Sequence, residues 1–272
     1  MINRSLITAT NTMTQLQKQL DNISNNLANI DTVGFKRRET NFQELLFQQF
    51  NNQPIDRNEA GRLTPNGVRQ GVGAKVSHTS LQLAQGSIKT TERALDVALL
   101  KENQFFEVEV DGQTRFTRDG SFSLSVLPSG DVQLVTSEGY PVSSENGPII
   151  FQEGYNNLII DANGQLNVQY PNGANEVFNL SVVQINRPQL LQSAGNNVYS
   201  LPNLAEINVL EADVFAAIGR NDIAMQQGAL EQSNVEMQKE MTELINTQRS
   251  YQFNAKSISI ADQMLGLING IR

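Results

Sequence analysis

The chain has 272 residues, 39% of them hydrophobic, and a formal net charge of −8 at pH 7. It can hold one large domain or two smaller ones, and it is too hydrophobic to be a disordered protein. It has no cysteine, which excludes disulfides and zinc–cysteine sites, and its only histidine is His78, which excludes a multi-histidine metal site. We therefore expect no cofactor and no metal.

The charge is unevenly distributed along the chain. Residues 1–50 carry +1 and residues 222–272 carry −2, which leaves −7 for the middle. This disfavours nucleic acid and anionic membranes as partners, and the basic run Lys36-Arg37-Arg38 is too short to change that. No apolar stretch is long enough to span a membrane, and the amino end lacks the apolar core of a secretory signal. The residues alone suggest a cytosolic protein, unless an export route with an uncleaved leader applies.

Residues 2–30 predict a long helix. Its apolar residues recur at alternating spacings of four and three, the 3.5-residue period of a helix that packs along another helix. The other face carries asparagines, which are weak helix formers, so we expect helicity only when the segment is packed. Gly34 follows and suits a left-handed position. The seam comprises Ile2, Leu6, Ala9, Met13, Leu16, Leu20, Ile23, Leu27 and Ile30.

The middle of the chain predicts an antiparallel all-β body. Phe42, Leu45, Leu46 and Phe50 first suggest a short helix, and residues 51–73 are rich in glycine and proline, as in a loop. From about residue 75 the apolar period becomes two, and we expect the fragment 75–200 to stay folded alone. Turn signals recur at Asp111-Gly112, Asp119-Gly120, Pro128-Ser129-Gly130, Asn163-Gly164 and Asn172-Gly173.

The carboxyl end predicts a second long helix. Residues 209–218 fit a strand or a helix equally well. The final helix is expected to begin near Gly228, with Ser233 and Glu236 as a capping box or with an earlier start near Leu230. Its seam comprises Met237, Met241, Leu244, Tyr251, Ala255, Ile258 and Leu265, interrupted by Gln248, Asp262 and Asn269.

These elements predict an α+β fold in which the long amino- and carboxyl-terminal helices form one helical layer, with an antiparallel all-β domain inserted between them. The expected segments are the helix 1–35, a connector with a short helix 36–74, the β domain 75–227 and the helix 228–272. The alternative is two ordinary amphipathic helices lying on a core. Ile245, Ile260, Leu267 and Ile268 lie off the seam, which points to contacts with other copies of the chain.

Three stretches carry motifs. Residues 20–36 read LDNISNNLANIDTVGFK, residues 116–122 read FTRDGSF after the paired Phe105-Phe106, and residues 228–249 read GALEQSNVEMQKEMTELINTQR, followed by SYQFNAK. In this order they resemble the signatures of the bacterial flagellar rod and hook family, over nearly the whole chain. The motif residues are Asn25, Asn26, Asn29, Gly34, Phe35, Asp119, Gly120, Leu230, Glu231, Ser233, Asn234 and Val235.

The resemblance implies a structural subunit of the flagellar rod, of the distal-rod type. It further implies export through the flagellar type III apparatus without cleavage, and assembly outside the cytoplasmic membrane into a helical tube with the terminal helices inside. The expected partners are copies of the chain, neighbouring rod and hook proteins and the export apparatus. The family usually has glycines before the paired phenylalanines and before its last motif. Residues 100–104 and 210–217 lack them, which suggests a variant rod subunit.

Other functions remain as alternatives. The chain could be another axial subunit of the same family, from the hook or the proximal rod. A β-rich polysaccharide hydrolase would need a carboxylate pair such as Asp111 and Asp119, although both are ordinary turn residues before glycine. A coiled-coil surface or tail-fibre protein would form closed trimers, and it would leave the FTRDGSF motif unexplained.

Overall fold

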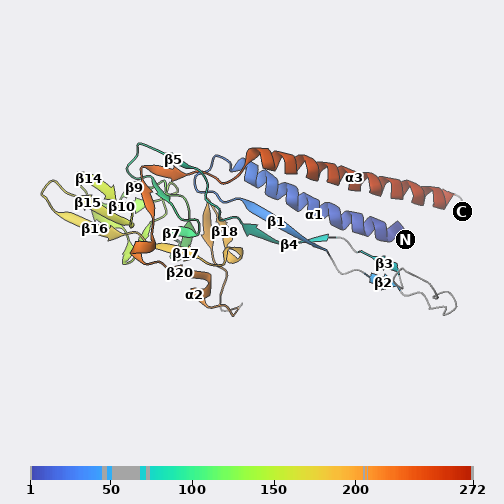
Figure 1. Ribbon diagram of the computed structural model, residues 1–272, viewed down its shortest axis with the longest axis horizontal. Helices are drawn as coiled ribbons and strands as arrows, with labels where there is room; N and C mark the ends of the chain where they lie inside the picture. Colours follow the sequence, from blue (N-terminus) through green and yellow to red (C-terminus); the bar gives the residue numbers. More distant parts are fainter. Residues whose placement is uncertain are drawn as a thin grey trace. The chain divides into compact units, whose positions relative to one another are not determined.

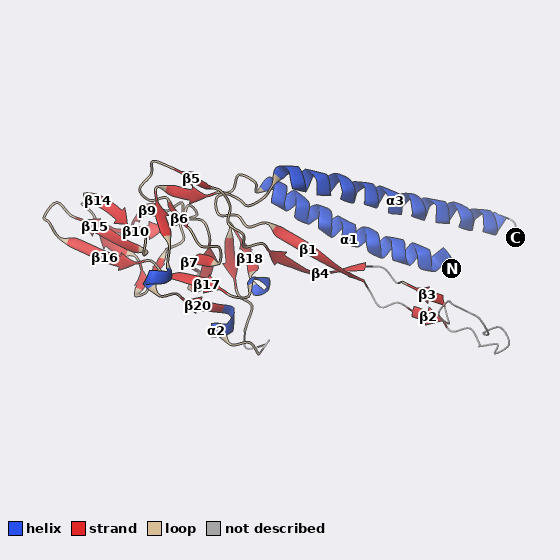
Figure 2. Ribbon diagram, in the orientation of Figure 1, coloured by secondary structure: helices blue, strands red, loops and turns tan. Residues whose placement is uncertain are grey.

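The computed structural model describes residues 2–44, 48–50, 68–71, 74–204, 206 and 208–270. Contacts divide the chain into two compact units, each discontinuous in sequence. We call Met1–Asn25, Glu39–Thr79 and Gln238–Arg272 the helical unit, and Asn26–Arg38 and Ser80–Met237 the β body. Figure 1 follows the chain from blue to red, and Figure 2 separates helices from strands.

The helical unit contains most of α1 (Ile2–Ala28), whose residues from Asn26 on belong to the β body, and α3 (Met237–Gly270) apart from its first residue. It also contains two two-stranded ribbons, formed by β1 (Arg38–Glu44) with β4 (Ala74–Leu81) and by β2 (Gln48–Phe50) with β3 (Val68–Gln70). The short helix predicted from Phe42 to Phe50 is therefore wrong in its described part. Pairing with a partner strand outweighs the local helical spacing, as is common for strands. Residues 45–47 lie outside the described residues.

The seam of α1 is partly covered. Its described residues from Leu6 to Ile30 are half-buried, apart from Ile23, which is 3% exposed, and Ile7 beside them is 57% exposed. The helix ends at Ala28, six residues before Gly34, so Gly34 does not cap it. The predicted left-handed conformation of Gly34 is nevertheless confirmed, with φ at +66°.

Helix α3 begins at Met237, later than predicted, because residues 229–231 form a strand instead of the first helical turn. Ser233 lies before the helix and accepts a hydrogen bond from the Val235 amide at 3.3 Å. Four residues of the predicted seam, Leu244, Tyr251, Ile258 and Leu265, are half-buried and lie on one stripe of the helix, and Ala255 beside them is half-buried as well. The buried or half-buried stripe is completed by Glu240, Thr247, Asn254 and Ala261.

Two predicted seam positions in α3 lie outside this stripe. Met237 is 54% exposed and Met241 is 46% exposed. The stripe uses positions 240, 247, 254 and 261, each one residue before the predicted positions 241, 248, 255 and 262. Small and polar side chains occupy these positions, where a search for apolar residues overlooks them. The hydroxyl of Thr247 is satisfied because it donates to the Glu243 carbonyl at 2.8 Å.

The β body is built on a six-stranded antiparallel sheet in the order β18-β19-β8-β7-β17-β20. Its central pair, β7 and β8, is joined by the predicted Asp111-Gly112 hairpin turn, in which both residues have positive φ. The strands are β7 (Gln104–Val110), β8 (Gln113–Thr117), β17 (Val182–Ile185), β18 (Gln192–Gly195), β19 (Val198–Ser200) and β20 (Phe215–Ala217).

Smaller antiparallel sheets complete the β body. Turns at Gly130, Gly164 and Gly173 join neighbouring strands as predicted, whereas Asp119-Gly120 joins strands of different sheets. The sheets are β9 (Ser123–Val126), β10 (Asp131–Val135) and β13 (Ile150–Gln152); β14 (Asn157–Ile160), β15 (Gln165–Gln169) and β16 (Asn175–Asn179); β11 (Ser143–Ser144) and β12 (Gly147–Pro148); β6 (Val97–Leu99) and β21 (Met225–Gln227); and β5 (Ile88–Thr90) and β22 (Ala229–Glu231).

The ambiguous stretch 209–218 contains both kinds of structure, because α2 (Glu211–Val214) leads directly into β20. The one-turn 3-10 helices η2 (Pro188–Leu190) and η3 (Arg220–Asp222) complete the described elements. Strands β20, β21 and β22 all follow residue 200. The β body therefore extends beyond the fragment 75–200 that was expected to fold alone.

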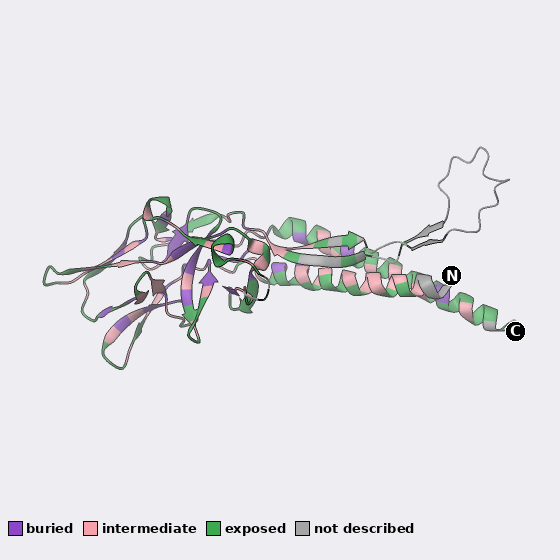
Figure 3. Cartoon of the chain, turned by 90° about the horizontal axis from the view of Figure 1, so that it is seen from below, coloured by how far each residue is buried: buried purple, intermediate pink, exposed green. Residues whose placement is uncertain are grey.

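The paired phenylalanines supply both faces of the central sheet. Phe106 lies in the larger core cluster with Phe122, its ring centroid 5.0 Å away. Phe105 points to the other face and packs edge-on against Tyr199 at 5.9 Å in a second cluster. Alternation along a strand that is buried on both sides explains the pair. Figure 3 shows that buried residues concentrate in the β body, whereas α1 and α3 carry mostly intermediate and exposed positions.

Candidate functional site

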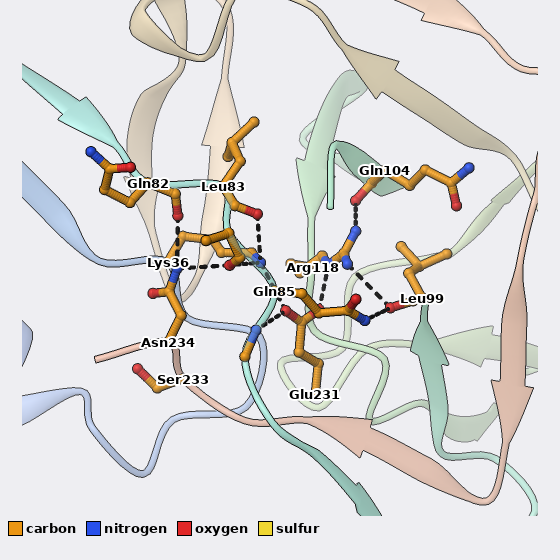
Figure 4. Close-up of polar contacts among 12 residues, drawn as sticks. Lys36, Gln82, Leu83, Gln85, Leu99, Gln104, Arg118, Glu231, Ser233 and Asn234 are labelled. Carbon is orange, nitrogen blue, oxygen red and sulfur yellow. Dashed lines mark hydrogen bonds and ion pairs between the residues drawn. The ribbon is translucent and has the colours of Figure 1, made fainter. Parts of the chain in front are cut away.

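The three sequence motifs meet inside the β body. The amino-terminal motif contributes residues 33–38, the FTRDGSF motif contributes Arg118, and the carboxyl-terminal motif contributes residues 229–235 (Figure 4). A fourth segment, residues 82–87, runs between them. We call this cluster the motif junction.

Glu231 is the centre of the motif junction. Its Oε1 accepts hydrogen bonds from Lys36 Nζ at 2.8 Å and from the Gly86 amide at 2.9 Å, and its Oε2 accepts one from Arg118 Nε at 2.5 Å. The Lys36 and Arg118 side chains are 0% exposed and the Glu231 side chain is 2% exposed. One buried carboxylate therefore neutralises two buried cations only in part, and a net positive charge remains.

Further donors of the two cations bind backbone carbonyls. Lys36 Nζ donates to the carbonyls of Leu83 at 3.2 Å and Ala84 at 3.0 Å. Arg118 donates to the carbonyls of Gln104 and Leu99, the latter at 3.1 Å. Because buried charges are tolerated only when they are paired and hydrogen-bonded, this pattern indicates a permanent structural cluster.

Burial and pairing both change the pKa values of these groups. Burial lowers the pKa of Lys36, and the neighbouring positive charge of Arg118 lowers it further. Burial also lowers the pKa of Arg118. For Glu231 burial raises the pKa, but Arg118 and Lys36 together outweigh it, and the pKa of the carboxyl lies below its usual range. Glu231 therefore stays ionised at neutral pH.

Two asparagines tie backbone segments together beside the charges. Asn234 accepts a hydrogen bond from the Arg37 amide at 2.7 Å and donates to the carbonyls of Gln82 and Ala84, each at 2.8 Å. Asn26 accepts from the Arg38 amide at 3.0 Å and donates to its carbonyl at 2.9 Å. Each of these contacts needs both a donor and an acceptor on one side chain, which an amide provides and a carboxylate does not.

Glycines allow the segments to approach closely. A β-carbon on Gly34 would lie 2.6 Å from the carbonyl carbon of Arg118, and one on Gly120 would lie 1.8 Å from the Val97 carbonyl oxygen. The Gly34 amide donates to the Glu231 carbonyl at 2.8 Å. The motif glycines therefore bring the three motifs into backbone contact.

Asp119 has a local structural role. Its Oδ1 accepts hydrogen bonds from the Ser121 amide at 2.9 Å and from the Ser121 hydroxyl at 2.7 Å. Burial raises the pKa of Asp119, although the hydrogen bonds from Ser121 and Ser137 oppose this. Asp111 lies beyond the other end of β8, a five-residue strand that spans about 16 Å. The carboxyl pair of a glycosidase is at most about 9.5 Å apart, so these two residues do not form one.

The described residues contain no group of three or more His, Asp or Glu side chains that could hold a metal ion. His78 lies in β4, and its side chain is outside the described residues. None of the helices in the described parts of the chain combines the length and hydrophobicity that crossing a bilayer requires.

Most of the predicted motif residues lie in or near the motif junction. Gly34, Phe35, Gly120, Glu231 and Val235 are buried, and Leu230 and Asn234 are half-buried. Asn29 accepts a hydrogen bond from the Thr32 hydroxyl in the turn after α1, and Asn25 is exposed. The sequence reasoning missed Lys36 and Arg118. A signal was present, since each is a charged residue inside a glycine-containing motif.

Comparison with known proteins matches the parts of the chain that contain the three motifs. Family models match residues 6–36 (flagella basal body rod protein), 100–168 (flagellar hook protein FlgE/F/G D1 domain) and 226–271 (flagellar basal body rod FlgEFG protein C-terminal). The chain is 46% identical to the flagellar hook-basal body complex protein FlhP of Bacillus subtilis, with 99% of each chain covered. It is 33% identical to the flagellar basal-body rod protein FlgG of Borreliella burgdorferi, with 99% of this chain and 98% of the relative covered. The chain belongs to the bacterial flagellar basal-body rod and hook protein family.

Proposed function

We propose that this chain is a structural subunit of the bacterial flagellar basal-body rod. The observation that carries the proposal is the motif junction, where the three rod and hook motifs form one set of buried contacts. Its role is mechanical, because it fixes the segments that follow α1 and precede α3 to the β body. The relatives bear the names of rod and hook-basal body proteins, which favours a structural role over catalysis.

The terminal helices are the proposed assembly elements. The half-buried seam of α1 and the buried stripe of α3 support pairing of the two helices in one helical layer. On α3, several large apolar side chains remain exposed, with Phe253 at 72% and Leu267 at 68%. These residues, together with Met237, Met241, Ile245, Ile260 and Ile268, are proposed to contact neighbouring subunits. Repeated contacts that do not close build a helical tube.

The location follows from the same proposal. The subunit leaves the cell through the flagellar type III export apparatus without cleavage, and it assembles outside the cytoplasmic membrane with its own copies and with neighbouring rod and hook proteins. Neither nucleic acid binding nor membrane insertion is part of this function. Another axial position, in the hook or the proximal rod, is the second candidate, since one matching family model is named for the hook protein.

Replacing both Leu20 and Leu27 with Asp tests the proposal. The two half-buried leucines lie seven residues apart on the seam, and two charges there cost several kcal/mol in a packed helix. We expect loss of swimming and loss of the subunit from purified basal bodies. The matched control replaces Gln17 and Ser24 with Asp, exposed positions of the same helix with the same spacing. Normal swimming of the leucine double variant would show that the seam does not serve assembly.

A further inference from the structure

The last strands of the β body pair with its first strands. Most of its strands lie between residues 88 and 217, but its last strands, β21 and β22, pair with β6 and β5, the first two. Met225 and Ala229 on these last strands are 3% and 0% exposed. The sheets at the start of the body are therefore completed by its own last strands.

The buried charges of the motif junction make the stability of the β body depend on its last segment. Lys36 and Arg118 come from the early and middle parts of the chain, and both are completely buried. Among the described residues, the only buried carboxylate paired with them is Glu231, 195 positions after Lys36. Glu102 also acts on both cations, but it lies on an exposed loop. Until Glu231 arrives, closing the body would bury two cations without a counter-charge, which is strongly unfavourable.

We infer that Glu231 acts as a closing residue, so that the whole β body reaches its stable fold only after the segment 229–235 has docked. A chain in which the segment 229–235 is absent or has not yet docked therefore cannot complete the β body. The closure itself is a property of the isolated chain and does not depend on the proposed function.

Hydrogen exchange of the purified full-length chain tests the inference. In E231Q the side-chain shape is kept and the charge is lost. We expect exchange to be on the order of 100- to 1000-fold faster in residues 33–38, in β7 and β8, and in the distant strands β14–β16 alike. The matched control E236Q changes an exposed glutamate five residues away and should leave exchange unchanged.

A second variant separates charge from shape. In K36M/E231Q one of the two unpaired cations is removed, so we expect slower exchange than in E231Q across β7 and β8. The inference is overturned if E231Q accelerates exchange only in residues 33–38 and 229–235, because Glu231 would then merely tether the chain ends. It is also overturned if K36M/E231Q exchanges as fast as E231Q or faster. Swimming and basal-body content, measured separately, report on the proposed function alone.

Discussion

Replacing Gly34 with Ala should destabilise the β body more than an equivalent change at an open glycine. Gly34 has a φ of +66°, a left-handed conformation that costs an alanine about 1–2 kcal/mol. The new β-carbon would also lie 2.6–2.7 Å from three backbone atoms of Arg118 and Asp119, which are held in the motif junction. Overpacking of this kind costs about 1–3 kcal/mol more. We therefore expect a total loss of about 2–5 kcal/mol.

Two other glycines separate the contributions. Gly173 has a φ of +82° with no atom within 4 Å of a β-carbon, so Gly173→Ala should show only the conformational cost. Gly120 lacks a positive φ, but its β-carbon would lie 1.8 Å from the Val97 carbonyl oxygen, so Gly120→Ala should show only the steric cost. The assay is urea unfolding of each full-length variant. Circular dichroism at a wavelength where the β-sheet signal dominates monitors the unfolding of the β body. If Gly34→Ala loses no more free energy of unfolding than Gly173→Ala, the close approach of the motifs is refuted.

Three further predictions concern acid, mobility and processing. The pKa of Glu231 is lower in the folded state than in the unfolded state. The stability that ionised Glu231 contributes is therefore complete above its unfolded pKa and is lost as the pH falls through its folded pKa. The raised pKa of Asp119 has the opposite effect on the pH dependence of stability. Stability of the wild-type chain should fall on acidification below about pH 4.5, and an equally steep fall in E231Q would contradict the assignment. In dilute solution, hydrogen exchange should be fast in residues 2–25 and 240–270 and slow from Phe105 to Val135; uniform protection would mean that the helices need no neighbouring subunit. Mass spectrometry of the basal-body form should find a chain that begins at or next to Met1, whereas a start twenty or more residues later would indicate a cleaved signal.

The local elements of this fold could be predicted from the sequence. The period of α1, the Asp111-Gly112 hairpin and the left-handed Gly34 each depend on residues near one another in the chain, where spacing and backbone preference decide the structure. The prediction of a short helix near Phe42 was wrong because the structure there depends on a distant segment. Strand β1 forms by pairing with β4, which begins thirty residues later. The predicted start of α3 was wrong for the same reason, because residues 229–231 pair with the distant strand β5 and form β22.

The motif junction could be predicted only in part. The motif residues were identified, but their meeting point depends on contacts between positions more than 100 residues apart, about which periodicity says nothing. Lys36 and Arg118 were missed because lysine and arginine are rarely fully buried, and a charged residue is normally assigned to the surface. Only the tertiary structure shows that Glu231 compensates them.

The buried stripe of α3 also determines the sense in which any element packed along it winds around the helix. Its positions from Glu240 to Leu265 alternate spacings of four and three without interruption, a period of 3.5 residues. A straight α-helix has 3.6 residues per turn, so such a stripe drifts by about 20° per heptad, or roughly 70° over this length. An element that covers the whole stripe must therefore wind around α3 in a left-handed sense. Inserting four residues into α3 would locally unwind that path, so the length of this helix is constrained as well as its composition.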